Sequence, residues 1–424
     1  MKSRTLTCIT AITLFAVLAI PVPLAAQKQI RYTVTDVGTL GGTFSQAGTL
    51  NNHGTVVGFS TLKGDTTLHA FLWRQGVMTD LGTIGKAATP AYSSATNVND
   101  QDEVVGFSET STPDPLGENF CGDSLVCLPF IWRSGVMTPL ITLGGTNAVG
   151  VSINNRGEVI GFAETSTADP TCLPPQILRI EPATWQRTMI TELPTFPGDP
   201  DGIATSINDA GEASLPTGNC MFAGPPLGHD SLLRHGTLTD FGTFEGNPIA
   251  ANDINNRAQV TGVTVDNAGN DVEGVIWQNG EASGLGFLPG DVVSIGSAIS
   301  DSGVVTGQSC NSNGNCRGFL WRNGVMTDLG TLVPADSPLD FPDPTGINSR
   351  GQIVGLGVQK STGELHGFLL TPTDTEVAGE NATPAAQGEF SQSRRVILPD
   401  VVRRALQRRL GSRHHIPGLG APRN

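Results

Sequence analysis

Short apolar runs, separated by turns rich in Gly, Asn and Asp, fill the chain from about residue 30 to residue 372. Runs of this length flanked by such turn residues predict β-strands. No ten-residue segment in this region combines the 3.6-residue period of an amphipathic helix with capping residues. The pattern therefore predicts an all-β protein.

The apolar runs belong to two alternating motifs. The first reads HAFLWRQGVMTDLGT from His69 and RGFLWRNGVMTDLGT from Arg317. The second reads INNRGEVIGFA from Ile153, and its first Asn, or the equivalent residue, stands at positions 51, 99, 154, 208, 255, 300 and 348. This spacing of 45 to 55 residues defines seven repeats, which we number 1 to 7. The centre of the first motif falls at Trp73, Trp132, Trp185, Leu233, Trp277, Trp321 and Leu370.

Each repeat offers four strands, A to D. Strands C and D flank a dipeptide such as Gln-Gly or Asn-Gly, which favours a two-residue hairpin turn. Strands A and B flank an Asn/Asp-x-x-Gly turn, whose residues tolerate left-handed backbone angles. Four short strands per repeat are typical of a propeller blade. The sequence predicts a seven-bladed β-propeller with four antiparallel strands per blade.

The two ends of the repeat array are complementary. It starts with a D-type strand, from Tyr32, and stops with a C-type strand, from His366. The N-terminal strand D is therefore expected to join the C-terminal strands A–C and close the ring, which leaves no open edge. An open β-solenoid is the alternative, but it would not need complementary ends.

The flanks predict three further segments around a propeller of residues 27–372. Residues 1–26 have a basic start, an apolar run and small residues before Gln27, as in a secretory signal peptide. Residues 373–395 are expected to be a disordered linker. Residues 396–424 are basic and include a short amphipathic helix, which could rest on an anionic surface; a frayed tail or docking on the ring is the alternative. A secreted protein, extracellular or periplasmic, is the expectation.

Six cysteines remain after the signal peptide, an even number that suits an oxidising compartment. Cys121 and Cys127 lie in one B–C loop, and Cys310 and Cys316 lie in another. Cys172 and Cys220 fall in the B–C loops of neighbouring repeats. We predict the pairs 121–127, 310–316 and 172–220, although six cysteines allow about fifteen connectivities.

The formal net charge of −14 argues against nucleic-acid binding, which needs a basic face. No G-x-S-x-G, H-E-x-x-H or phosphate-binding glycine loop is found, so no catalytic residue is assigned and no cofactor is expected. Calcium is the one ion considered, at three aspartates of D–A loops for which ordinary surface turns are the favoured interpretation: Asp199, Asp201 and Asp291.

With its repeats laid out, the chain resembles the extracellular HAF-repeat family, named for the triplet that stands here as His69, Ala70 and Phe71. The resemblance covers about residues 30–372. It implies a secreted bacterial repeat protein of propeller type with no assigned activity.

The residue type varies from repeat to repeat at the position four residues before the recurring Trp. It is polar or charged in six of the seven repeats and lies where strand C begins, near the face of the B–C and D–A loops. A ligand-binding surface is one interpretation, and capping of each strand end in solvent is the other. The six candidates are His69, Glu181, His229, Glu273, Arg317 and His366.

The longest B–C insertions fall in repeats 2, 3 and 4, at about residues 109–128, 164–180 and 213–228. Long loops on a rigid scaffold often carry binding sites. We therefore expect a non-enzymatic protein that binds a protein or glycan through this loop face; a carbohydrate-active hydrolase or lyase is the alternative. The insertions are rich in acids, which favours a cationic or calcium-bridged partner: Glu109, Asp114, Glu118, Asp123, Glu164 and Asp169.

Overall fold

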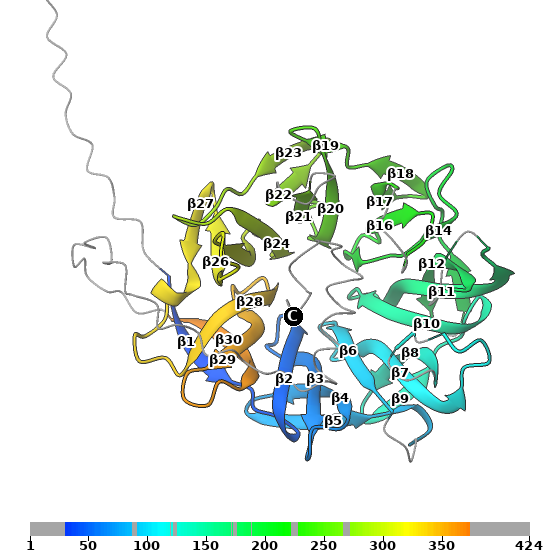
Figure 1. The fold of residues 1–424 in the computed structure, drawn as a ribbon, viewed down its shortest axis with the longest axis horizontal. Coiled ribbons are helices and arrows are strands. Elements are labelled where there is room, and N and C mark those ends of the chain that lie inside the picture. Colours follow the sequence, from blue (N-terminus) through cyan, green and yellow to red (C-terminus); the bar gives the residue numbers. More distant parts are fainter. Residues whose placement is uncertain are drawn as a thin grey trace, which may run out of the picture.

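The computed structural model describes residues 30–86, 91–118, 120–121, 125–170, 172, 176–187, 189–221, 228–265 and 272–373. Over these residues the chain forms β-sheets arranged around a central axis, so the predicted all-β propeller architecture is confirmed (Figure 1). The predicted signal peptide, linker and basic tail lie outside the described residues, apart from Thr373, which ends the last strand. No helix in the described part of the chain is long and apolar enough to cross a membrane.

Each repeat forms one antiparallel group of strands, numbered from the axis outward. Repeat 1 forms β2 (Gly41–Leu50), β3 (Val56–Leu62), β4 (Leu68–Arg74) and β5 (Val77–Gly82). Repeat 2 forms β6 (Ser93–Val98), β7 (Val104–Pro113), β8 (Leu125–Arg133) and β9 (Val136–Pro139). Repeat 3 forms β10 (Gly144–Ile153), β11 (Glu158–Ala168), β12 (Leu178–Gln186) and β13 (Met189–Glu192). Repeat 4 forms β14 (Asp201–Gly202), β15 (Ser206–Ile207), β16 (Ala213–Gly218), β17 (Asp230–Arg234) and β18 (Thr237–Asp240).

The later repeats follow the same order. Repeat 5 forms β20 (Asn247–Ile254), β21 (Val260–Val265), β22 (Val272–Gln278) and β23 (Glu281–Gly284), with the short β19 (Thr243–Phe244) paired to β20. Repeat 6 forms β24 (Val293–Ile299), β25 (Val305–Cys310), β26 (Cys316–Arg322) and β27 (Val325–Asp328). Repeat 7 forms β28 (Leu339–Ile347), β29 (Ile353–Gln359) and β30 (Leu365–Thr373). Two 3₁₀ turns, η1 (Ile84–Lys86) and η2 (Leu329–Thr331), follow β5 and β27.

The strands at the two ends of the array pair with each other. β1 (Arg31–Asp36) runs antiparallel to β30 over six residue pairs, from Arg31 with Thr373 to Asp36 with Phe368. The predicted pairing of the first and last strands is therefore observed. One parallel contact, between Phe44 and Leu365, joins this group to repeat 1, so that the two groups count as one eight-stranded sheet.

A glycine in strand B explains how closely strand A approaches it. In repeat 3 a Cβ at Gly161 would lie 2.0 Å from the carbonyl oxygen of Val149 in β10, so no other residue fits without moving the backbone. The register of strand A shifts at the same place, which indicates a bulge opposite the glycine. Equivalent glycines meet strand A in the same way in repeats 1, 2, 5, 6 and 7: Gly58, Gly106, Gly262, Gly307 and Gly355.

Repeat 4 lacks this glycine and shows the consequence. Leu215 takes the position and is fully buried. The innermost strand is broken there into β14 and β15, and the residues between them, 203–205, lie opposite Leu215. We attribute the break to the leucine side chain, which occupies the space that strand A fills in the other repeats.

The predicted turns are confirmed by their backbone angles. In repeats 1, 2, 4, 5 and 6, the residue before Gly in the C–D hairpin has a positive φ, from 47° at Ser134 to 54° at Asn279. Such angles at both turn residues match the twist of the flanking strands. In the A–B turns, Gly54, Gly157 and Gly351 have φ between 73° and 81°.

The hydrophobic core lies between neighbouring repeats. One cluster joins Val105 and Ile131 of repeat 2 to Ala163 and Trp185 of repeat 3. Trp185 is 1% exposed, and its indole N–H donates to the carbonyl of Ile141 at 2.8 Å. Trp73 and Trp277 are also buried, whereas Trp132 and Trp321 are half-buried.

Candidate functional site

The start of strand C carries an ion-pair clasp to strand D. In repeat 1 the Nδ1 of His69 lies 2.9 Å from the carboxylate of Asp80, which also accepts the backbone N–H of Gly82 at 2.7 Å. His366 makes the same contact with Asp36, at 2.9 Å, across the closure between β30 and β1. The clasp explains why the first motif begins with His and ends with Asp-x-Gly.

The clasp changes the acidity of its carboxyl groups. Burial alone would raise the pKa of Asp36 and Asp80, but hydrogen bonds from the paired histidine and from a backbone N–H outweigh it. The net result is a pKa below the usual range at both positions.

The remaining candidates also have internal partners. Arg317 bridges Asp328, at 3.0 Å, and Asp291, at 2.8 Å. The His229 ring lies 2.9 Å from the Asp199 carboxylate and stacks on Phe196 with ring centroids 4.0 Å apart.

Two acidic candidates complete the series. Glu181 lies 3.5 Å from Arg179, and Glu273 accepts the backbone N–H of Gly286 at 3.1 Å. The six candidates belong to different repeats and do not meet at a common point, so their role in ligand binding stays a prediction. Two of the three weak calcium candidates, Asp199 and Asp291, are held by a basic side chain.

All three predicted disulfides are present. Cys121–Cys127 and Cys310–Cys316 each close a short loop. Cys172–Cys220 joins the B–C insertions of repeats 3 and 4. Among the described residues, the one three-residue group with metal-ligand spacing is Cys172, Asp201 and Cys220, and both of its sulfur atoms are used in the disulfide.

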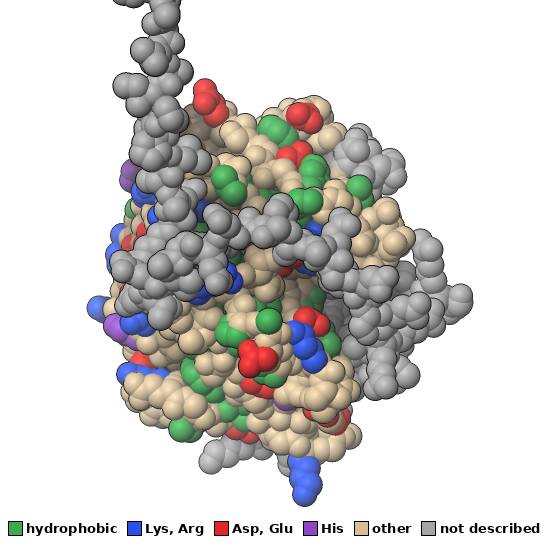
Figure 2. Space-filling view, turned by 90° about the vertical axis from the view of Figure 1, so that its left-hand side faces the viewer, with side chains coloured by type: hydrophobic (Ala, Val, Ile, Leu, Met, Phe, Trp, Pro, Cys, Tyr) green, Lys and Arg blue, Asp and Glu red, His purple; other side chains and the backbone are tan. Residues whose placement is uncertain are grey.

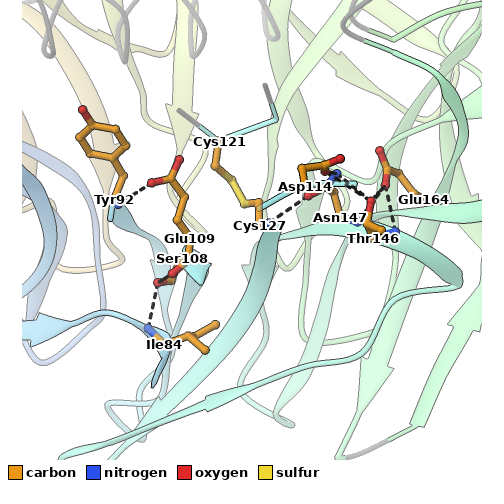
Figure 3. The surroundings of a disulfide bond; sticks show 10 residues. All are labelled: Ile84, Tyr92, Ser108, Glu109, Asp114, Cys121, Cys127, Thr146, Asn147 and Glu164. Carbon is orange, nitrogen blue, oxygen red and sulfur yellow. Dashed lines mark hydrogen bonds between the residues drawn. A yellow bond between two sulfur atoms is a disulfide. The ribbon is translucent and has the colours of Figure 1, made fainter. Parts of the chain in front are cut away.

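Polar contacts link the insertions of repeats 2 and 3. Asn147 of β10 donates to Asp114 at 2.6 Å and accepts the N–H of Cys127 at 2.9 Å (Figure 3). One oxygen of Glu118 accepts the N–H groups of Ile177, at 2.7 Å, and Leu178, at 3.2 Å.

A second set of contacts joins the insertion of repeat 4. The side chain of Gln176 accepts the N–H of Met221 at 2.8 Å. Phe120 and Met221 pack on a core cluster that contains Phe162 and Ile180. The three insertions therefore form one interlocked cap over repeats 2 to 4.

The acids of this cap point inward, which corrects the expectation of an acidic surface. The exposed fraction is between 0% and 9% for all five that the structure describes: Glu109, Asp114, Glu118, Glu164 and Asp169. Asp123 lies outside the described residues. A charged residue in a loop is usually solvated, but here backbone N–H groups of the neighbouring insertion require acceptors. The cap thus offers few carboxylates to a cationic partner.

Burial raises the pKa of carboxyl groups in and beside the cap. The pKa of Glu164 rises to about 7, through desolvation and the nearby charge of Glu118. Desolvation also raises the pKa of Asp201 to about 7, with Asp169 adding to the effect, and the pKa of Glu181 to about 7, with Glu192 adding to it.

The A–B turns lie at the end of the propeller away from the cap, around the central channel. Their sequences predicted only turns, but their Asn side chains form a ring of amides. In the A–B turn of repeat 1, the side-chain Oδ1 of Asn51 accepts the N–H groups of His53 and Thr55, and the side-chain NH₂ donates to the backbone carbonyl of Asn99 in repeat 2, at 2.9 Å. The same inter-repeat bond recurs at every repeat that has Asn in this position, including from Asn348 to Asn51 across the closure at 2.9 Å. Repeat 6 has Ser300 there instead.

The next residue of each turn forms a second, outer ring. Asn155 donates through its NH₂ to Asp209 at 3.1 Å, and Asn256 donates to Asp209 and Asp301, each at 3.1 Å. The two rings line a cavity of about 150 Å³ at the channel mouth. The sequence signal was the alternation of Asn and Asp at this position: Asn52, Asp100, Asn155, Asp209, Asn256, Asp301 and Ser349.

Over the side seen in Figure 2, acidic and basic side chains are interspersed. Much of this charge is paired between turns of one face, as in Arg74 with Asp102 at 2.9 Å and Arg133 with Glu103 at 2.6 Å.

Comparison with known proteins supports the fold and no more. No family model matches the chain, and no curated protein matches it. Prolyl endopeptidases are similar at 9% identity with a TM-score of 0.50, over 82% of this chain and 50% of theirs. The β-propeller domain of a protease from Pyrococcus furiosus is similar at 10% identity with a TM-score of 0.44, over 67% of this chain and 81% of its own. A lectin from Aleuria aurantia in complex with alpha-methyl-L-fucoside is similar at 9% identity with a TM-score of 0.32, over 80% of this chain and 99% of its own. The chain spans about half the length of the endopeptidases, and at such identities the likeness concerns the fold alone.

Proposed function

We propose that the chain is a secreted, non-enzymatic binding propeller of seven blades that holds a protein or glycan through its B–C/D–A loop face. The seven repeats and the pairing of β1 with β30 support the blade count. The N-terminal 26 residues and the three disulfides support secretion. The HAF-type motif, found in every repeat with varying fidelity, supports membership of that repeat family.

The interlocked cap over repeats 2 to 4 is the observation that carries this proposal. The blades themselves are complete with B–C connections of about five residues, as in repeat 1, where β3 ends at Leu62 and β4 begins at Leu68. Repeats 2 to 4 add a shared structure held by disulfides and hydrogen bonds between blades. A loop surface fixed before binding loses little conformational entropy when a partner docks.

The residues that the cap exposes indicate what kind of partner it binds. Its described acids are buried, so charge attraction is not the main source of affinity. Its exposed described residues are small, polar or apolar and include Leu116, 41% exposed, and Thr167. Such a surface suits contacts through hydroxyl groups and apolar patches, which glycans and protein surfaces both provide.

A pair of matched surface variants tests the location of binding. Leu116→Glu places a charge on the cap, and Val136→Glu places one on a 62% exposed residue at the other end of the same repeat. The protein is screened on a glycan array and on a peptide array. We expect binding that Leu116→Glu weakens by about tenfold or more and that Val136→Glu leaves unchanged.

Two results would contradict the proposal. Release of reducing sugar from an array glycan would make the chain an enzyme, the alternative raised by the sequence. Binding that only Val136→Glu removes would place the working surface on the opposite face. Cutting the insertions back is a poor test, because Phe120 and Met221 pack against a core cluster and their removal would unfold the cap.

A further inference from the structure

Two carboxylate oxygens inside the cap have no hydrogen-bond donor. They are the Oε2 of Glu118 and the Oε1 of Glu164, and both side chains are 1% exposed. Neither residue makes an ion pair with a Lys or Arg among the described residues. Buried acceptors of this kind are costly, because water has been removed and nothing has replaced it.

The two carboxyl groups are neighbours, and each is held in place through its other oxygen. Glu118 comes from the repeat 2 insertion and Glu164 from β11, and they lie within hydrogen-bond reach of one another. The second oxygen of Glu118 is fixed by the N–H groups of Ile177 and Leu178. The second oxygen of Glu164 is fixed by the N–H of Thr146, at 3.2 Å, and of Asn147, at 2.8 Å (Figure 3).

Two further carboxyl groups lie near the pair, and the neighbouring Arg179 is directed to Glu181 instead, at 3.5 Å. Asp114 lies beside it, on the other side of Asn147, and its Oδ2 accepts from the Asn147 side chain (Figure 3). Asp201, next to Asp169, accepts the N–H of Ile180 two residues beyond Leu178. Two neighbouring acceptors amid further carboxylates repel unless a positive species lies between them.

We propose that Glu118 and Glu164 together bind a divalent cation of the calcium class, which ties the insertion of repeat 2 to repeat 3. Carboxylate oxygens are the preferred ligands of hard cations, and one dication neutralises both groups. Calcium takes about six to eight oxygens, so backbone carbonyls and water complete its shell. The site differs from the D–A loop aspartates considered in the sequence analysis.

A shared proton is the competing way to satisfy the pair. Neither carboxylate carries a hydrogen at high pH, so the two can hydrogen-bond only when one is protonated. Burial and the neighbouring charge raise the pKa of Glu164 to about 7, which makes this form accessible in mildly acidic solution. The proton and the cation therefore predict different responses to pH and to calcium.

The test measures thermal unfolding of the purified protein at pH 7.5, first in EDTA and then after addition of calcium chloride in excess of the chelator. We expect calcium to raise the Tm and calorimetric titration to give one site. Glu118→Gln and Glu164→Gln, which keep the side-chain shape, should each lower calcium affinity by roughly tenfold or more, because ligand charge sets affinity. Glu181→Gln removes a buried acid that has its own arginine partner and should leave calcium binding unchanged.

Each other outcome overturns the proposal. Absence of a Tm change and of binding heat at millimolar calcium rules out the site. A Tm that calcium does not change at either pH, and whose rise between pH 8 and pH 5 is smaller in Glu164→Gln, assigns the pair to a shared proton. Calcium binding that survives in both Gln variants places the cation elsewhere. If a Gln variant fails to fold, titration of the wild-type protein at pH 7.5 and at pH 5 still decides, because protonation should weaken calcium binding at this pair. Failure of this test leaves the proposed partner-binding function untouched, since the arrays are read without reference to calcium.

Discussion

Repeats 3 and 4 are neighbours built from the same motifs, yet only one of them has a continuous innermost strand. In repeat 3, Gly161 allows β10 to run unbroken past β11. In repeat 4, Leu215 takes that place and strand A splits into β14 and β15. The irregular repeat is also the one tied to its neighbour by Cys172–Cys220. The comparison teaches that a glycine at this position allows a regular blade. The repeat that lacks the glycine is irregular and is linked to its neighbour by a disulfide.

Exchanging the two residues should give the largest effect. Gly161→Leu brings a side chain to within 2.0 Å of the Val149 carbonyl oxygen and should destabilise the fold by about 5 kcal/mol, at the upper end for single substitutions. Leu215→Ala should cost roughly 2–4 kcal/mol, through the cavity it leaves. Urea unfolding curves measure both. Equal stability of Gly161→Leu and the wild type would remove the proposed role of the glycine.

Removing single disulfides should give the next largest effect and should again separate the two kinds of repeat. Cys172–Cys220 closes a loop of 48 residues, and Cys310–Cys316 in the regular repeat 6 closes one of 6. The chain-entropy model gives about 4 kcal/mol for the longer loop and about 2 kcal/mol for the shorter one. Double serine variants of each pair, compared by thermal unfolding, test this order. A larger loss from the repeat 6 pair would show that loop length does not decide.

The pH dependence of stability should differ in sign between the buried Asp230 of repeat 4 and the clasp of repeat 1. Burial raises the pKa of Asp230 in repeat 4 to about 7. The stability linked to this group is fully present below its unfolded pKa near 3.8 and is lost as the pH rises through about 7. This group alone should therefore cost the protein on the order of 1–2 kcal/mol between pH 5 and pH 8, because each pKa unit is worth about 1.4 kcal/mol and local relaxation reduces the full shift. Asp230→Asn should flatten this slope.

The clasp of repeat 1 supplies the matched control. The pKa of Asp80 is lowered, so its contribution is present above its usual pKa and is lost as the pH falls below that value. Asp80→Asn should therefore lower stability at pH 7 and leave it little changed near pH 2. Guanidinium unfolding at pH 2, 5 and 8 distinguishes the two variants. An unchanged slope in Asp230→Asn would show that other groups cause the loss between pH 5 and pH 8.

The architecture could be predicted from the sequence repeats, because each motif specifies a turn, a strand or a register. The Gln-Gly turn residues, the complementary end strands and the loop positions of the cysteines each predicted a feature that the structure contains. The purpose of the strand B glycine was missed, since a close approach between strands has no signature within one strand.

The burial of the acids could not be predicted from the sequence. Glu118 and Glu164 stand in polar loop-like segments, where solvation is the usual state of a carboxylate. The burial of Glu118 depends on backbone N–H groups of the next repeat, 59 residues away in the case of Ile177, and that of Glu164 on N–H groups of the neighbouring strand β10. Only the packed cap brings these groups together. The clasp of His69 and Asp80 was missed for the same reason, although it recurs as His366 with Asp36 and is replaced in repeat 6 by Arg317 with Asp328. Repeat 2 has Leu128 and Pro139 at these positions and lacks it.

In the outer ring at the channel mouth, it matters whether the number of positions is odd or even. Donors and acceptors can alternate around a closed circle without a fault only if the number of places is even, and this circle has seven. Ser349 takes the odd place: its hydroxyl donates to Asp301 at 3.0 Å and its backbone N–H donates to the Asn52 side chain at 3.0 Å. Loss of a single repeat, such as that of Asn155, would set the carboxylates of Asp100 and Asp209 side by side, whereas loss of two adjacent repeats would keep the alternation. The side chains of the outer ring thus depend on the number of repeats. The array can gain or lose repeats with its alternation of donors and acceptors intact only two at a time.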